Sequence, residues 1–213
     1  YIIGNHAVKP YSIVPKTHIK ITNPFQMMQR TINSIGIKSN IFSPKIYTSK
    51  HDSIRSRSIL KANSLKDNNF VILICGSNKR GKNKRWGTEN FNALAGLIQK
   101  KYRCKSVLIG GPDDMEECLS ISRNDKTIIN LCNKTNLIEL IEIFSNAKFI
   151  ISNDTGTAHL ASSTKTPMIV ITGPTDPKKV KPFGKKILAL QANSKDMNGV
   201  TPADILDNII KIL

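Results

Sequence analysis

Four groups of different chemistry stand close together in ISNDTGTAHLAS, residues 151–162. Asp154 offers a carboxylate, Thr155 a hydroxyl, Gly156 a bare backbone and His159 an imidazole. The stretch could be a protease aspartate, an anion-binding turn or an ordinary helix cap. An aspartic protease pairs two aspartates that share one proton, whereas this sequence holds a single Asp-Thr-Gly. An anion site is favoured, with backbone N–H groups at a helix start facing the ligand.

A second stretch with polar chemistry is GSNKRGKNKRW, residues 76–86. Gly76 allows close backbone approach and Ser77 offers a hydroxyl. Five cations in this stretch could neutralise a diphosphate: Lys79, Arg80, Lys82, Lys84 and Arg85. The spacing of the glycines resembles a Walker A phosphate loop, but Asn83 stands where that loop has a Ser or Thr for magnesium. A nucleotide hydrolase stays open as an alternative, as does a solvated basic loop.

Two more loops add polar groups. In GGPDD, residues 110–114, Asp113 or Asp114 could accept hydrogen bonds from a ribose. The alternative is that one of them caps the following helix. In TGPTDP, residues 172–177, Gly173, Pro174 and Thr175 could wall a pocket, or the segment could be a plain turn.

These loops separate apolar runs that alternate with amphipathic segments. Strands are predicted at 70–75, 106–111, 127–131, 148–154, 167–173 and 186–190. Helices are predicted at 88–102, with Thr88 as N-cap, and at 113–123, 136–147, 155–164 and 201–213, with Thr201 as N-cap. This alternation predicts an α/β fold, a Rossmann-like parallel sheet with helices on both faces. The strands' carboxyl ends then share one edge, where the loops at 76–87, 110–114 and 153–157 meet.

The first third of the chain has a different character. Residues 24–37 show helical spacing, with Gly36 suited to the helix end. Residues 43–69 are polar and basic, which predicts a linker or an exposed connection.

Composition limits the possible partners. The chain has 213 residues and a formal net charge of +17, which attracts polyanions unless it only reflects a general bias toward lysine. A nucleic-acid-binding module is a further alternative. It is disfavoured because aromatic residues make up only 6% and do not interleave with the basic runs. The four cysteines lack metal-site spacing, so buried thiols and no metal are expected. The absence of a long apolar run or signal peptide predicts a cytoplasmic protein without a membrane helix.

The motifs occur in the order and spacing of a known family. Residues 76–91, 108–114, 133–162, 171–177 and 196–213 resemble the family 9 glycosyltransferases, the ADP-heptose:lipopolysaccharide heptosyltransferases and their relatives. The resemblance implies the C-terminal half of a two-domain GT-B fold. Residues 66–213 would be the donor-binding domain, and residues 1–65 the remnant of the N-terminal acceptor domain and a linker.

The resemblance also implies roles for individual residues. Ser77 and Lys84 would contact the donor diphosphate, and Asp114 the ribose, although family members with a better match have a longer glutamate there. Asp154 would hold the hydroxyls of the transferred sugar. Thr155 and Gly156 would supply N–H groups to phosphate beside His159, while Gly76, Gly173 and Thr175 would wall the pocket.

The implied reaction is inverting, metal-independent transfer from a nucleotide-diphosphate sugar, ADP-heptose, to a lipopolysaccharide-core-type acceptor. No cofactor and no nucleic acid are expected. The protein would act as a monomer, at the cytoplasmic face of the inner membrane. The family's presumed catalytic base is an aspartate early in the first domain, a position upstream of Tyr1. We therefore expect donor binding without normal transfer if the chain begins at Tyr1.

Overall fold

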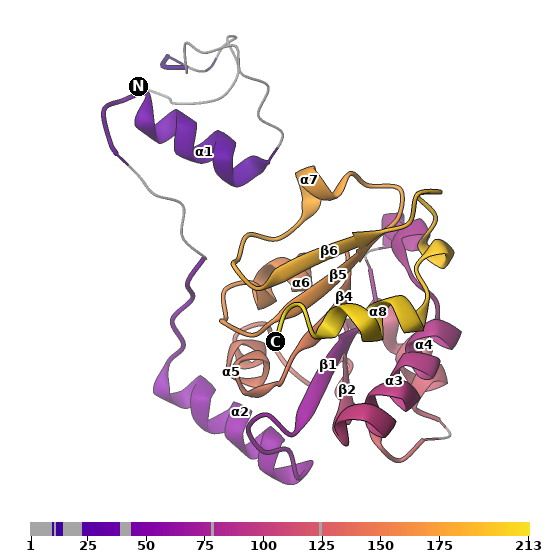
Figure 1. The fold of residues 1–213 in the computed structure, drawn as a ribbon. Coiled ribbons are helices and arrows are strands. Elements are labelled where there is room, and N and C mark those ends of the chain that lie inside the picture. Colours follow the sequence, from indigo (N-terminus) through magenta and orange to yellow (C-terminus); the bar gives the residue numbers. More distant parts are fainter. Residues whose placement is uncertain (1–9, 11, 15–22, 39–43, 78, 124) are drawn as a thin grey trace.

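The computed structural model describes residues 10, 12–14, 23–38, 44–77, 79–123 and 125–213. Figure 1 shows a layered α/β unit, with helix α1 (Pro24–Asn33) standing apart from it on the N-terminal side. The ring of Phe25 at the start of α1 lies 5.7 Å, centroid to centroid, from Phe183 of the layered unit. The termination predicted at Gly36 is confirmed by its positive φ of 84°.

The centre of the fold is a six-stranded sheet. Its strands are β1 (Phe70–Ile74), β2 (Lys105–Ile109), β3 (Ile128–Asn130), β4 (Ile150–Asn153), β5 (Met168–Thr172) and β6 (Ile187–Gln191). Their order is β3-β2-β1-β4-β5-β6, and every neighbouring pair is parallel. All six strands were predicted. The order reverses between β1 and β4, which is the crevice where ligands bind in such sheets.

Strands buried on both faces explain the unbroken apolar runs. In β1, Val71 and Leu73 join one apolar cluster, while Phe70, Ile72 and Ile74 join the other. The first cluster is covered by α3 (Thr88–Tyr102), α4 (Met115–Ser122) and α8 (Pro202–Ile209). The second is covered by α2 (Lys50–Ala62), α5 (Glu139–Asn146) and α6 (Gly156–Ala161). The predicted sheet with helices on both faces is confirmed.

Helix α2 corrects the prediction of a linker at 43–69. Ser49 and Asp52 form a capping box at its start. Ser56 is buried, and its Oγ donates to the carbonyl of Glu139 at 3.0 Å. Arg55 Nε lies 2.6 Å from Oε1 of the buried Glu139. The sequence signal was weak because α2 buries few large apolar residues and presents a polar, basic surface.

Two smaller differences concern helix ends. Helix α3 begins at Thr88 as predicted, but its N-cap is Gly87, with a φ of 95°, and Thr88 makes no cap bond. A short helix, α7 (Pro177–Val180), follows β5 and was not predicted. It is one turn long, capped by Asp176. A helix of four residues leaves no apolar periodicity to read.

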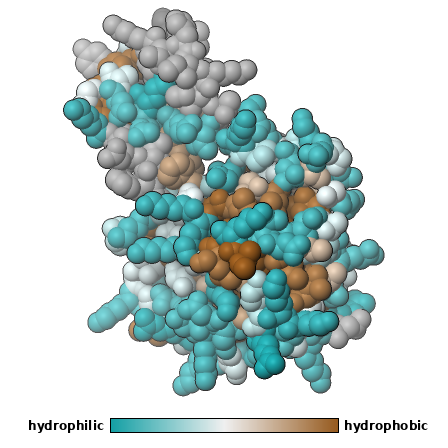
Figure 2. All heavy atoms as spheres, viewed as in Figure 1, coloured by the Kyte–Doolittle hydropathy of each residue, from teal (hydrophilic) through white to brown (hydrophobic). Residues whose placement is uncertain are grey.

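The edge strand β6 and helix α8 leave apolar side chains near the surface. Every residue of β6 is half-buried, and Ile210 just after α8 is exposed. Figure 2 shows the corresponding brown patch in the middle of the view, surrounded by long hydrophilic side chains. None of the helices in the described ranges is both long and apolar enough to cross a membrane.

Candidate functional site

The carboxyl ends of β1, β2, β4 and β5 bring the chemically promising loops together. Residues 75–87 follow β1, 110–114 follow β2, 154–156 follow β4, and 173–177 follow β5. Hydrogen bonds and ion pairs link all four segments. The predicted meeting of these loops at one edge is therefore confirmed.

Asp154 is the centre of this edge. Lys84 Nζ lies 2.7 Å from Oδ2 of Asp154, and Thr175 Oγ1 donates to the same oxygen at 3.0 Å. Asp154 is only 7% exposed, whereas the Lys84 side chain is 30% exposed. Both donors approach Oδ2, so within the described residues Oδ1 is left to accept from a ligand. The arrangement pairs a hydroxyl-accepting carboxylate with a cation that reaches the surface.

Arg85 makes a second polar junction beside the first. Its Nη2 donates to Asp114 Oδ1 at 3.0 Å and to the carbonyl of Ser77 at 2.8 Å, and its Nη1 pairs with Glu117. The backbone N–H of Gly111 donates to Asp114 Oδ2 at 2.9 Å. Asp114 is thus held from both sides. The sequence analysis grouped Arg85 with four other cations and did not predict that it holds Asp114 in place.

Gly76 is required by the position of Asp114. A Cβ built on Gly76 would overlap the Asp114 carboxyl group. The backbone of the β1 loop therefore passes directly over the carboxylate that follows β2. Close approach was predicted for Gly76, and the structure shows that Asp114 is what it approaches. At Gly173 a Cβ would lie 2.7 Å from Met197 Sδ, so this glycine also reflects tight packing.

Ser77 turns inward. Its side chain is buried, and its Oγ donates to the carbonyl of Gly81 at 2.5 Å. This bond closes the loop over the short 3₁₀ segment Lys79–Lys84. Because α3 begins only at Thr88, no long helix starts at Gly81-Lys82, which is where a Walker A loop would place one. The structure therefore does not support the alternative hypothesis of a nucleotide hydrolase with a Walker A loop.

Two residues that the sequence analysis did not single out, one buried and one half-buried, hold these loops. Asn153 is fully buried; its Nδ2 donates to the Cys75 carbonyl at 2.6 Å and its Oδ1 accepts from the N–H of Trp86 at 3.3 Å. Gln191 Nε2 donates to the carbonyls of Gly173 and Thr175, at 2.5 and 2.9 Å. The one available signal was the position of Asn153, directly before Asp154 at a strand end.

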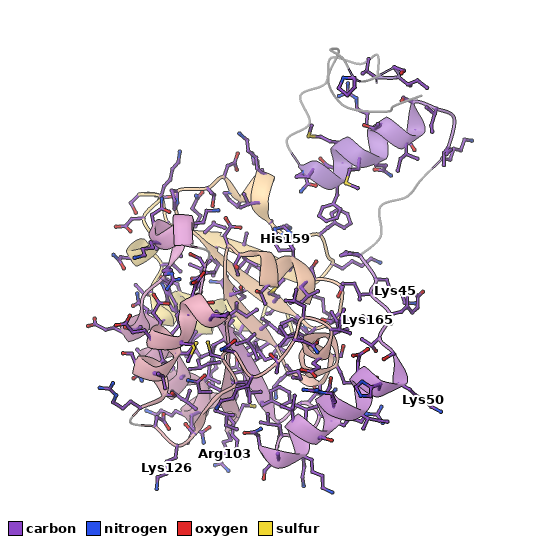
Figure 3. All side chains as sticks on the ribbon, turned by 180° about the vertical axis from the view of Figure 1, so that it is seen from behind. Lys45, Lys50, Arg103, Lys126, His159 and Lys165 are labelled. Carbon is purple, nitrogen blue, oxygen red and sulfur yellow. The ribbon has the colours of Figure 1, made fainter. Side chains whose placement is uncertain are left out.

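Helix α6 places His159 near the same edge. The imidazole is exposed and is labelled in Figure 3, which views the molecule from behind. Partial desolvation lowers the pKa of His159 below its ordinary value; the charge of Asp154 opposes this shift, and that of Lys84 adds to it. Thr155 is the N-cap of α6 and Gly156 its first residue, and no side-chain cap bond closes this helix start.

The four cysteines are free and buried, as predicted. Cys75 Sγ lies 3.4 Å from Cys118 Sγ, behind the Gly76 loop. This hydrogen bond, together with burial, raises the pKa of Cys118 far above its usual range, so the thiol stays protonated. Across the described ranges, no three His, Cys, Asp or Glu side chains are grouped so that they could hold a metal ion.

Comparison with known proteins gives a consistent answer. The family model described as glycosyltransferase family 9 (heptosyltransferase) matches residues 14–209. Lipooligosaccharide heptosyltransferase 2 of Haemophilus influenzae is 25% identical over 138 residues, covering 63% of this chain and 40% of the relative. Lipopolysaccharide heptosyltransferase 1 of Escherichia coli K12 is 25% identical over 126 residues, covering 59% and 39%. The chain thus spans about two fifths of these relatives.

Solved structures show the same fold. The family 9 glycosyl transferase from Veillonella parvula superposes with a TM-score of 0.81 at 20% identity, covering 91% of this chain and 60% of that one. The E. coli heptosyltransferase WaaC with ADP gives a TM-score of 0.70 at 19% identity, covering 96% and 60%. This likeness confirms a Rossmann-like unit of the GT-B type.

Proposed function

The chain belongs to glycosyltransferase family 9, and from that premise we propose that its carboxyl edge binds a nucleoside-diphosphate sugar, with ADP-heptose as the donor. The observation that carries the proposal is the trio of Lys84, Asp154 and Thr175, joined at 2.7 and 3.0 Å. One of the solved neighbours is a complex with ADP and another a complex with ADP-2-deoxy-2-fluoro heptose.

The trio suits the two ends of such a donor. A carboxylate accepts hydrogen bonds from sugar hydroxyls, and Asp154 keeps Oδ1 for them. The Lys84 ammonium has three N–H donors, one of which is used on Asp154. The others can reach a diphosphate above the edge. Thr175, predicted only as a pocket wall, orients the carboxylate that would hold the sugar.

The second junction suits the nucleoside. Asp114 is placed to accept from ribose hydroxyls, because each of its oxygens keeps a lone pair beyond the bonds from Arg85 and Gly111. Arg85, Glu117 and Asp113 line a hollow of about 690 Å³ together with Lys82 and Glu116. We place the nucleoside against this hollow, with the backbone of Gly76 and Ser77 toward the diphosphate, because the Ser77 hydroxyl is turned inward to the Gly81 carbonyl.

The proposed transfer is a direct displacement at the anomeric carbon, with inversion and without metal. Negative charge develops on the departing diphosphate, and Lys84 with the N–H groups of Thr155 and Gly156 would stabilise it. As negative charge develops on the phosphate, the Lys84 ammonium would turn from the Asp154 carboxylate toward the phosphate oxygens. The catalytic base is expected from the family's first domain and is not assigned to any residue of the donor edge.

We further propose a lipid-linked saccharide of the lipopolysaccharide-core type as acceptor, reached from the cytoplasmic side of the membrane. The named heptosyltransferase relatives support this choice. A monomeric protein is proposed, with the donor domain at residues 66–213 and residues 1–65 as the remnant of the acceptor domain and its linker. Helix α2 lies before that proposed boundary yet packs on α5, so we count this helix with the donor domain.

Isothermal titration calorimetry with ADP and ADP-heptose, in the presence of EDTA, tests the donor site. We expect binding without metal, and Lys84→Ala or Asp154→Ala should weaken it by roughly tenfold to a hundredfold, the range for a lost charged hydrogen bond. Lys100→Ala, an exposed lysine on α3, is the matched control and should leave the affinity unchanged. Binding that needs magnesium and a γ-phosphate would contradict the proposal and favour a nucleotide hydrolase.

A further inference from the structure

A large hollow lies at the amino ends of β5 and β6, at the edge opposite the proposed donor site. Its volume is about 700 Å³, within the range of ligand-binding cavities. Segments 163–166 and 183–187 form it together with Pro44 and Lys45, which precede α2. Five-residue strands separate it from the donor edge, a distance of roughly 15 Å or more.

The rim of this hollow is cationic. Lys45, Lys165, Lys185 and Lys186 all line it, and no carboxylate does so among the described residues. All four are exposed side chains. Figure 3 shows Lys45 and Lys165 together on the same side of the molecule. Lys186 Nζ donates to the Leu213 carbonyl at 3.2 Å, and Lys45 Nζ lies 4.9 Å from the centre of the Tyr47 ring. All four charges are positive, so an anion in the opening would be attracted to them.

The floor of the hollow is apolar. Phe183 and Ile187 contribute side chains to it, and so does Pro44. The hydroxyls that line it are turned away. Ser163, Thr164 and Thr166 each donate to a backbone carbonyl, at 2.7, 2.8 and 2.7 Å. An apolar floor lined at its edge by lysine side chains fits a ligand with a hydrocarbon portion and an anionic head.

The surroundings extend the positive charge. A smaller hollow of about 340 Å³ shares Lys165 and Thr166 with the first and adds Lys148. Each strand of the sheet has a cation in the segment just before it or at its first residue: Lys66, Lys105, Lys126, Lys148, Lys165 and Lys186. The amino edge therefore carries a cation at or before the start of each strand, alongside the carboxylates of Asp67 and Asp125; Figure 3 labels Lys126 and Arg103.

We propose that the hollow binds an anionic phospholipid of a bilayer, with the phosphate on the lysine rim and part of an acyl chain over Phe183 and Ile187. A strip of lysines around it would add attraction to an anionic membrane surface. The site is separate from the proposed donor site and does not depend on it. Nucleic acid fits less well, because the described residues that line the hollow offer a single ring, Phe183, on which bases could stack.

Flotation with phospholipid vesicles tests the site. The chain should bind phosphatidylcholine vesicles that contain phosphatidylglycerol and should not bind phosphatidylcholine alone. Replacing Lys165, Lys185 and Lys186 together by Glu should weaken binding roughly a hundredfold or more. The matched control replaces Lys100, Lys178 and Lys179 by Glu, an equal charge change on exposed lysines outside the hollow. It should weaken binding less than tenfold, and equal loss in both triple variants would overturn the proposal.

Competition separates a lipid from a simple anion or a nucleic acid. Monomeric short-chain phosphatidylglycerol should displace the protein from vesicles, and glycerol phosphate at the same concentration should not. Equal displacement by glycerol phosphate, or displacement by a single-stranded oligonucleotide alone, would overturn the lipid assignment. ADP binding by the Lys165/Lys185/Lys186 variant should equal that of the unsubstituted chain, which shows that the variant is folded and keeps the two sites independent.

Discussion

Asp154 shows how much of a binding site can depend on which oxygen of a carboxylate is occupied. Lys84 and Thr175 both use Oδ2, on one side of the group. The neighbouring Asp114 is held by Arg85 on one oxygen and by a backbone N–H on the other. Both aspartates follow a strand in the sequence, but their hydrogen bonds differ. From the part of the chain that the structure describes, Asp154 accepts on one oxygen only, whereas Asp114 accepts on both and is fixed in place.

The pKa of His159 should report on the charges of Asp154 and Lys84. Because desolvation lowers its pKa, we expect the imidazole to titrate below 6.5 in an NMR pH series. Asp154→Asn removes a charge that raises this pKa and should lower it further; Lys84→Ala should raise it. Since the folded pKa lies below the unfolded one, the group contributes stability above about pH 6.5 that is lost as the pH falls through the folded pKa. An unchanged pKa of His159 in both variants would contradict this and place the imidazole away from both charges.

A methyl group at Gly76 should be costly. Gly76→Ala forces the new Cβ against the Asp114 carboxyl group and should lower the free energy of unfolding by about 1–3 kcal/mol in urea denaturation. ADP affinity should fall with it, because Asp114 must move. Gly96→Ala is the control: nothing lies within 4 Å of its Cβ, and it sits within α3. That change should stabilise the fold by about 0.5–1 kcal/mol; a similar loss at both positions would contradict the close packing at Gly76.

At the scale of elements, segments with a clear pattern of apolar residues were predicted correctly, and segments without one were missed. The runs at 70–75 and 168–171 are fully apolar because both faces of β1 and β5 are buried, so these strands could be assigned directly. Helix α2 was missed because its packing on α5 uses Ser56, Arg55 and the buried Glu139, which resemble linker residues in a sequence. The site was predicted as a set of loops, but its pairings depend on side-chain geometry that spacing does not encode.

Two threonines at helix starts should differ in their contribution to stability. Thr201 accepts from the N–H of Asp204 and forms a capping box before α8, so Thr201→Ala should destabilise the protein by about 1 kcal/mol. It should also raise the pKa of Asp204, which the hydrogen bonds from Thr201 hold below its ordinary value. Thr88→Ala at the start of α3 removes no cap bond, so its effect on stability should be near zero. Thermal denaturation of the two variants measures both effects. Equal effects at the two positions would rule out the capping explanation.

At the scale of the whole molecule, the two edges of one sheet carry different surfaces. The carboxyl edge mixes carboxylates with cations in bonded pairs. At the amino edge, the described residues that line the hollow of about 700 Å³ include four lysines and no carboxylate. A sheet that separates two such edges can hold a nucleotide at one and a membrane at the other.

The whole chain is predicted to bind the donor without transferring its sugar. The base that the family resemblance implies would lie in the first domain, and the donor edge is proposed to supply binding and leaving-group stabilisation. A radiolabelled ADP-heptose assay with a lipopolysaccharide-core acceptor should show no transfer by these 213 residues alone. Saturable ADP-heptose binding in the same preparation serves as the control for a folded donor site. Transfer at a measurable rate would require a base within this chain.

The position of Trp86 has a practical consequence. It is the single tryptophan of the chain, fully buried, with its Nε1 donating to the Val200 carbonyl at 2.6 Å and its backbone next to Arg85. Its indole connects the loop that carries Lys84 to the segment leading into α8. When excitation selects tryptophan over the four tyrosines, the emission therefore comes from one place. Its intensity or wavelength should change when a nucleotide engages Lys84, without any added dye.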